Sequence, residues 1–158
     1  MAECDAVFFA TSAGVSQKLA LTFIDNNFPV IDLSGDFRLA DLKIYNKWYK
    51  NTDLKNEYLL SAQYNLADIG QAKANYIANP GCYATATLLA LYPLVKNKMI
   101  DLASIIVDAK SGLSGAGKGL SDASHFVNVV DNMSMYKTNS HQHIPEIAQQ
   151  LKIWNSNF

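Results

Sequence analysis

The chain has 158 residues, of which 49% are hydrophobic and 17% charged, and its formal net charge is −1 at pH 7. This length and apolar content are enough for a buried core in one domain or in parts of two, which excludes a disordered or collagen-like chain. The near-neutral charge gives no broad attraction to nucleic acid or anionic lipid, so we expect neither as a partner. No apolar run is long enough for a membrane span and no signal peptide precedes the first strand, which predicts a cytoplasmic protein.

The first part of the chain reads as strand, helix and strand. Residues 5–10 form an apolar run, a turn follows at 11–14, and Val15, Leu19 and Phe23 then share one face of a predicted helix. A second short strand of the buried type covers 29–33. This order predicts a parallel sheet of the doubly wound α/β type.

The pattern loosens between residues 36 and 75. Tyr45, Trp48 and Tyr49 suggest a short helix anchored by aromatic side chains, and residues 63–66 suggest an extended connection. We expect no part of the core in this region.

The second part of the chain begins with a strand at 76–78 that is broken by Pro80 and Gly81, and a helix follows over 83–92. Cys82 is therefore expected at a helix N-terminus, where unpaired N–H groups and the positive end of the helix dipole favour a reactive thiolate. The alternative is a buried structural thiol, which is our interpretation of Cys4 in its apolar strand. Two cysteines are too few for a disulfide scaffold or a structural zinc site.

A thiolate that forms an acyl-enzyme also needs a proton donor and hydrogen bonds to the developing oxyanion. Backbone N–H groups at the start of the helix can supply the hydrogen bonds. His141 and His143 are two residues apart, so in an extended segment both would project from one face and one could meet Cys82 across a cleft. A metal site lacks a third ligand at a recognisable spacing, so we expect no metal, and surface histidines are the remaining alternative. His125, in a predicted amphipathic helix, is expected to be structural.

A predicted strand at 104–108 leads into a glycine-rich stretch that nearly matches the P-loop pattern between Gly112 and Gly119. Gly119 stands where a P-loop carries its magnesium-binding hydroxyl, which disfavours a nucleotide triphosphatase. The turn could still let the backbone approach a nicotinamide or a phosphate. Arg38 follows the second strand at the edge where open α/β sheets bind ligands, so it either clamps an anion or solvates a turn.

Four motifs stand in the same order as in a known family. The chain resembles the N-acetyl-gamma-glutamyl-phosphate reductases over essentially its whole length, through residues 30–39, 79–85, 111–117 and 141–146. The Asn-Pro-Gly-Cys-Tyr element at 79–83 is the most specific of the four. The aspartate-semialdehyde dehydrogenases are similar but differ around the arginine and the cysteine, and they are the alternative acyl-phosphate reductases.

The resemblance implies a partial Rossmann-type parallel sheet in residues 1–80, followed in 81–158 by the start of an α+β catalytic domain of the semialdehyde dehydrogenase type. It implies that NADPH reduces N-acetyl-gamma-glutamyl phosphate to the semialdehyde in arginine biosynthesis, through a thioester on Cys82. In this resemblance His141 is the general acid and base, while His143 and Arg38 contact the small-molecule acyl-phosphate substrate. The implied contacts to NADP are Ser12, Gly14, Ser114, Gly115 and Gly117.

Members of the family open with a strand and a glycine-rich turn that binds pyrophosphate, and nothing before Asp5 can supply that unit. Their catalytic domain also continues well beyond the position of Glu146. The chain therefore looks like the middle of a longer reductase, with an inactive fragment as an alternative. Self-association could cover exposed edges, so we expect a homo-oligomer.

Overall fold

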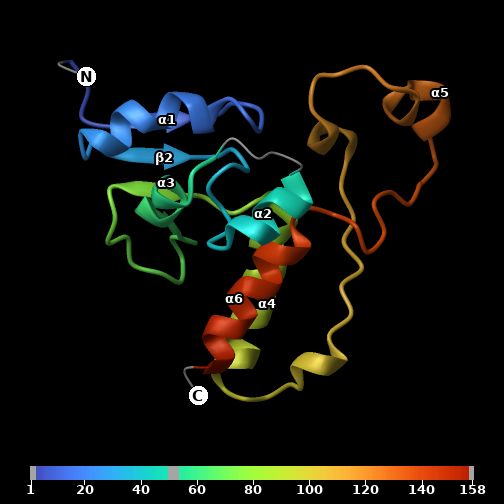
Figure 1. The fold of residues 1–158 in the computed structure, drawn as a ribbon. Helices are drawn as coiled ribbons and strands as arrows, with labels where there is room; N and C mark the ends of the chain where they lie inside the picture. Colours follow the sequence, from blue (N-terminus) through green and yellow to red (C-terminus); the bar gives the residue numbers. More distant parts are fainter. Residues whose placement is uncertain (1–2, 50–53, 157–158) are drawn as a thin grey trace.

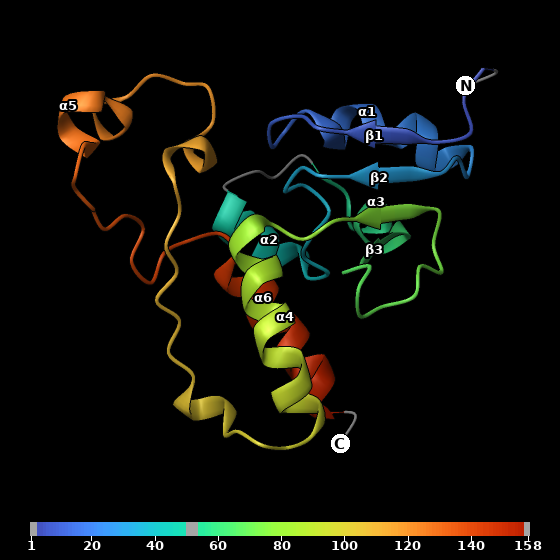
Figure 2. The same cartoon turned by 180° about the vertical axis from the view of Figure 1, so that it is seen from behind.

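The structure is a computed structural model that describes residues 3–49 and 54–156. Four short parallel strands form one sheet in the order β1-β2-β4-β3 (Figures 1 and 2). These strands are β1 (Val7–Phe9), β2 (Val30–Asp32), β3 (Ala62–Tyr64) and β4 (Tyr76–Ala78). The helices are α1 (Ser16–Asp25), α2 (Leu42–Tyr49), α3 (Asn56–Ser61), α4 (Cys82–Lys96), α5 (Phe126–Val129) and α6 (Ile144–Ser156). The predicted α/β fold with a parallel sheet is confirmed.

One face of the sheet carries the first hydrophobic core. Phe9, Val30 and Tyr76 point into it from three strands and are buried together with side chains from the helices that follow β1 and β2. On the other face, Phe8, Ile31 and Ile77 lie in register across the same strands, and Phe8 is 65% exposed. Parallel sheets are usually covered on both faces, so this apolar row has less cover than is typical.

The region between residues 36 and 75 contributes strongly to this core, which makes our expectation for it wrong. Its fully buried side chains include Phe37, Leu39, Tyr45 and Leu59. The predicted extended connection overlaps β3, which pairs with β4 as the fourth strand. Each of several short elements contributes only one or two of these buried residues, so the sequence shows no periodic apolar pattern there.

Helix α1 forms where it was predicted, but it buries a different face. Ser16, Gln17 and Ala20 are buried, whereas Val15 and Leu19 are about half exposed. The first residues of α1 hydrogen-bond to a buried carboxylate, and this polar contact turns the face with Ser16 and Gln17 toward the protein interior.

That carboxylate belongs to Asp36, which is fully buried. It accepts hydrogen bonds from the backbone N–H groups of Gly14 (2.8 Å) and Gln17 (3.1 Å), from the Ser16 hydroxyl (2.9 Å) and from the Tyr45 hydroxyl (3.2 Å). An anion at a helix N-terminus satisfies N–H groups that have no partner within the helix. Asp36 therefore fixes α1 against the end of β2.

The second core joins α4 to α6, which lie side by side (Figures 1 and 2). Ala84, Leu88 and Val95 of α4 are buried with Trp154 of α6, and the Trp154 and Tyr92 rings meet at 5.1 Å. The helix predicted after Cys82 is confirmed, and Cys82 is its first residue.

Residues 105–140 leave this helix pair as a long excursion that carries α5 (Figure 1). The strand predicted at 104–108 is wrong, since this stretch holds only the end of a 3₁₀ turn (Leu102–Ser104) and then unpaired backbone, with Ile106 93% exposed. A strand requires a neighbour for its N–H and C=O groups, and none lies beside this stretch in the described part of the chain. His125 is exposed at the start of the four-residue α5 and belongs to neither of the two hydrophobic cores in the described residues.

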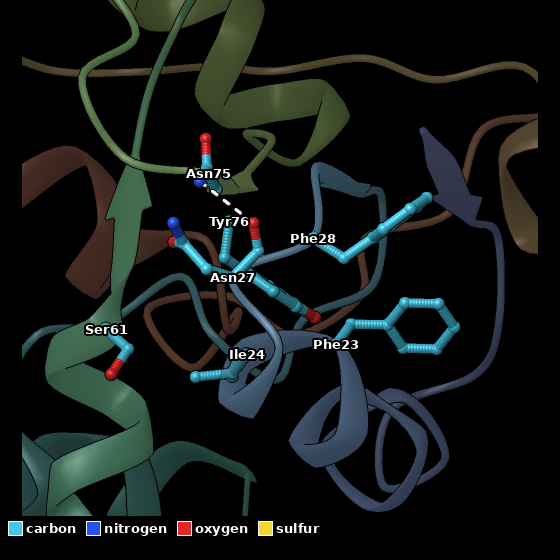
Figure 3. Close-up of a pocket in the computed structure, with 7 residues that line it drawn as sticks. All are labelled: Phe23, Ile24, Asn27, Phe28, Ser61, Asn75 and Tyr76. Atoms are coloured by element: carbon cyan, nitrogen blue, oxygen red, sulfur yellow. Dashed lines mark hydrogen bonds between the residues drawn. The ribbon is translucent and has the colours of Figure 1, made fainter. Parts of the chain in front are cut away.

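A small pocket opens at the ends of β2 and β4 where these strands begin (Figure 3). Phe28 and Tyr76 line it, and the Asn75 side chain donates a hydrogen bond of 3.0 Å to the Asn27 carbonyl at its rim. Ligands of open α/β sheets bind at the opposite, carboxyl ends of the strands. A ligand site is therefore expected at that other edge of the sheet.

Replacing Asp36 with alanine is expected to lower the free energy of unfolding by about 3 kcal/mol or more, because several buried donors lose their acceptor together. Urea denaturation followed by circular dichroism measures the change. Asp25→Ala, at an exposed position at the end of α1, is the matched control and should change stability by less than about 0.5 kcal/mol. A similar loss in both variants would contradict this role for Asp36.

Candidate active site

Cys82 lies at the carboxyl edge of the sheet. Asn79, Pro80 and Gly81 turn the chain from the end of β4 into α4, and Cys82 is exposed in the first turn of that helix. Gly81 has no room for a side chain, because a β-carbon there would collide with the His143 ring. The predicted placement of Cys82 at a helix N-terminus is confirmed, and this turn lies directly against a histidine.

Cys4 does not fit its sequence interpretation. It was expected to be buried in the first strand, but it precedes β1 and is exposed. The apolar run in the sequence starts before the sheet does, since β1 pairs with β2 only over Val7–Phe9.

Glu146 lies behind this turn and is fully buried. Its carboxylate accepts hydrogen bonds from the Gly81 N–H (3.1 Å) and the Tyr64 hydroxyl (3.3 Å), and it pairs with the Arg38 guanidinium at 3.4 Å. Burial raises the pKa of Glu146, while the Arg38 charge and these hydrogen bonds lower it. No role for Glu146 was predicted from the sequence, although its place in the first turn of a helix just after two histidines was the available signal.

Arg38 is almost fully buried beside Glu146. Its Nε donates to the Asn79 carbonyl at 2.8 Å and its Nη2 to the Leu33 carbonyl at 2.7 Å. The guanidinium thus ties the ends of β2 and β4 together. The predicted contact between Arg38 and substrate stays a prediction.

His143 shares the Arg38–Glu146 cluster. Its Nε2 lies 3.5 Å from Arg38 Nη1 and 3.8 Å from Glu146 Oε1, while its buried Nδ1 has no hydrogen-bond partner among residues 3–49 and 54–156. Burial lowers the pKa of His143 to about 4, and the charges of His141, Arg38 and Lys137 act in the same direction. His143 is therefore a neutral ring at pH 7.

His141 lies next to His143, with ring centroids 4.5 Å apart. The two residues occupy the turn before α6 and not an extended segment, so their nearness comes from that turn. The His143 N–H donates to His141 Nδ1 at 3.1 Å. Partial burial lowers the pKa of His141, and the Lys137 charge lowers it further.

The residues proposed for the cofactor fall into two places. Ser12 and Gly14 follow β1 at the carboxyl edge of the sheet, but the Gly14 N–H is already bonded to Asp36. Ser114, Gly115 and Gly117 lie on the exposed excursion, around a 3₁₀ turn (Leu113–Ala116) that ends at Gly117 with a φ of 83°. No strand precedes this turn and no α-helix begins at Lys118 in the described chain, so the setting of a P-loop is missing.

Within the part of the chain that the structure describes, no three His, Cys, Asp or Glu side chains are grouped so that they could hold a metal ion. In the same residues, no helix combines the length and apolar character needed to cross a membrane.

Iodoacetamide is expected to alkylate Cys82 much faster than Cys4 at mildly acidic pH. Both thiols are exposed, but only Cys82 stands at the start of a long helix, where backbone N–H groups have no partner within the helix. Mass spectrometry of quenched digests gives both rates in one sample. Equal rates for the two thiols in the folded protein would contradict the prediction.

Stability is expected to fall on acidification between pH 6.5 and about 4, in part through His143. A base with a lowered pKa in the folded state is protonated first in the unfolded chain, so stability is complete above pH 6.5 and is lost as the pH falls toward 4. Denaturation of His143→Gln should show a shallower decline, by at most about 1.4 kcal/mol per pH unit. His125→Gln at an exposed site is the control, and equal slopes in both variants would contradict the assignment.

Comparison with known proteins gives two family matches and several close relatives. A family model described as the semialdehyde dehydrogenase NAD-binding domain matches residues 1–74, and one described as the semialdehyde dehydrogenase dimerisation domain matches residues 82–157. The chain is 97% identical over 158 residues to an N-acetyl-gamma-glutamyl-phosphate reductase of Lactococcus lactis, and it spans 46% of that relative. It is 60% identical over 158 residues (99% of the chain) to a reductase of the same name from Streptococcus mutans and spans 46% of that protein. It is 59% identical over 148 residues (94% of the chain) to N-acetyl-gamma-glutamyl-phosphate reductase 2 of Lactiplantibacillus plantarum and spans 43% of that protein. The chain thus covers less than half the length of these relatives.

Proposed function

The chain belongs to the semialdehyde dehydrogenase family, and on that basis we propose that it is part of an NADPH-dependent N-acetyl-gamma-glutamyl-phosphate reductase of arginine biosynthesis. The observation that carries the proposal is Cys82 exposed at the start of α4, with His143 packed against the preceding glycine and His141 beside it. The names of the relatives favour this substrate over that of the aspartate-semialdehyde dehydrogenases.

In the proposed reaction the Cys82 thiolate attacks the acyl carbon of the substrate. The C–O bond to phosphate breaks, phosphate leaves and a thioester remains. When bound, NADPH would supply the hydride for the thioester carbonyl, and the carbon–sulfur bond to Cys82 would then break to release the semialdehyde and the thiolate. The N–H groups in the first turn of α4 are suitably placed to stabilise negative charge on the carbonyl oxygen during these steps.

The histidines have separate roles in this proposal. His141 exchanges the proton with the carbonyl oxygen of the substrate, since it is the less buried of the pair. His143 and Arg38 hold the substrate side of the site. The His143 Nδ1, which has no hydrogen-bond partner within the described chain, supports a ligand contact there.

The residues present fit only one end of the dinucleotide. Ser12 and Gly14 follow the carboxyl end of β1, where Ser12 is exposed and Gly14 leaves room because it lacks a side chain. The strand that leads to Cys82, β4, is two strands away from β1, a separation of about 10 Å in a sheet. These features suit a flat nicotinamide. The N–H groups at the start of α1 are occupied by Asp36, so the pyrophosphate must be held elsewhere.

We propose two domain parts, 1–80 and 81–158, which the bounds of the two family matches and the two separate cores support. The match to a dimerisation domain supports a homo-oligomer, and the substrate is a small molecule. The cytoplasmic location stays a prediction.

The test is an assay of NADP⁺ reduction with phosphate and N-acetylglutamate semialdehyde, on this chain and on a hybrid in which it replaces the matching segment of the Lactococcus lactis relative. The hybrid should be active, and Cys82→Ser should lower kcat by roughly a thousandfold or more, whereas Cys4→Ser should not. A folded hybrid that reduces no NADP⁺, or one in which Cys82→Ser keeps its activity, would refute the proposal.

In the same hybrid, His141→Asn is expected to lower kcat about a hundredfold while binding of NADP stays nearly unchanged, as for a lost general acid. His143→Asn should act mainly on KM. Steady-state kinetics separate the two effects, and reversed phenotypes would exchange the roles of the two residues.

A further inference from the structure

Two tyrosines meet beside Cys82 from distant parts of the chain. Tyr83 is the second residue of α4, and Tyr136 lies near the end of the exposed excursion. The Tyr136 hydroxyl donates to the Tyr83 hydroxyl at 2.9 Å, and the rings are 6.4 Å apart. This bond holds the end of the excursion against the first turn of the helix that carries Cys82.

His141 packs against both of these rings. Its centroid lies 5.2 Å from that of Tyr83 and 5.7 Å from that of Tyr136, and both pairs are nearly perpendicular, at 85° and 78°. Edge-to-face contacts of this kind are favourable and restrict the tilt of a ring. The imidazole is therefore held by two phenols that are themselves bonded to each other.

The backbone sets the protonation form of the same imidazole. Because His141 Nδ1 accepts the His143 N–H at 3.1 Å, the neutral ring carries its hydrogen on Nε2. Partial burial, then the hydrogen bond to Tyr83, and last the charge of Cys82 raise the pKa of Tyr136 to about 12, so this phenol is neutral at pH 7. The site thus constrains both the orientation and the tautomer of His141 near Cys82.

We propose that Tyr83 and Tyr136 are positioning residues, a hydrogen-bonded phenol pair that holds the His141 ring in place for proton exchange with the carbonyl oxygen of the substrate bound at Cys82. This inference rests on the proposed reductase function for its catalytic consequence. The positioning itself is a property of the folded chain and is measured without turnover.

The first experiment follows the His141 imidazole in this chain by ¹⁵N–¹H correlation NMR over pH. The wild-type ring should show mainly the Nε2–H tautomer and a titration midpoint below 6.5. Tyr136→Phe keeps the ring but removes the hydroxyl bond that holds it against His141. The imidazole should then be less restrained and less buried, so the variant should mix the tautomers and move the midpoint upward, toward that of a free histidine. Tyr83→Phe breaks the same bond from the other side and should reproduce the effect.

Tyr92→Phe is the matched control, because Tyr92 lies on the same helix and packs against Trp154 in the second core. It should leave the His141 signals unchanged. Signals of His141 in folded Tyr136→Phe and Tyr83→Phe that equal those of the wild type would overturn the proposal.

The second experiment measures kinetics in the active hybrid, where Tyr136→Phe should lower kcat about tenfold with KM changed less than about twofold. The pH profile of kcat should move together with the His141 midpoint. A kcat equal to that of the wild type would overturn the catalytic part of the inference. If the hybrid of otherwise wild-type sequence reduces no NADP⁺, the reductase proposal fails, and the NMR result still decides whether the phenol pair positions His141.

Discussion

The buried carboxylate of Glu146 joins the parts of the chain on which the site depends. It contacts Arg38 after β2, Tyr64 at the end of β3 and the Gly81 N–H before α4, and it is itself on α6. Removing one partner from a buried ion pair typically costs about 3–5 kcal/mol, because the remaining charge is left without compensation. The Glu146 carboxylate is therefore a central contact that orients α6 against the sheet, and with it the place of both histidines.

Much of the fold and the position of Cys82 were predictable from the sequence, because they depend on local patterns. The apolar runs that became β1, β2 and β4 are bounded by turn residues, and the Pro-Gly break before Cys82 marks the start of a helix. The closeness of His141 and His143 also follows from their spacing, although a turn and not an extended segment produces it.

The buried acidic residues and the missing strand could not be predicted, because both depend on partners far away in the chain. Asp36 and Glu146 are both acidic residues that a sequence reading assigns to the surface, and only the fold shows the donors that surround them. For the apolar residues around Ile106 the sequence predicted a strand that the structure does not contain. They have strand propensity, but propensity produces a strand only where another strand supplies hydrogen bonds, and none lies there in the described chain.

The excursion between α4 and α6 has a consequence for chain entropy. The two helices pack together although roughly fifty residues separate them, so their contact closes a long loop of mostly exposed chain. The cost of closing a flexible loop grows only with the logarithm of its length, about 0.6 kcal/mol for each doubling. Insertions or deletions within the excursion should therefore change the stability of the helix pair only slightly. A shift of one turn along α6 would instead separate Trp154 from Tyr92 and Glu146 from Gly81 at once.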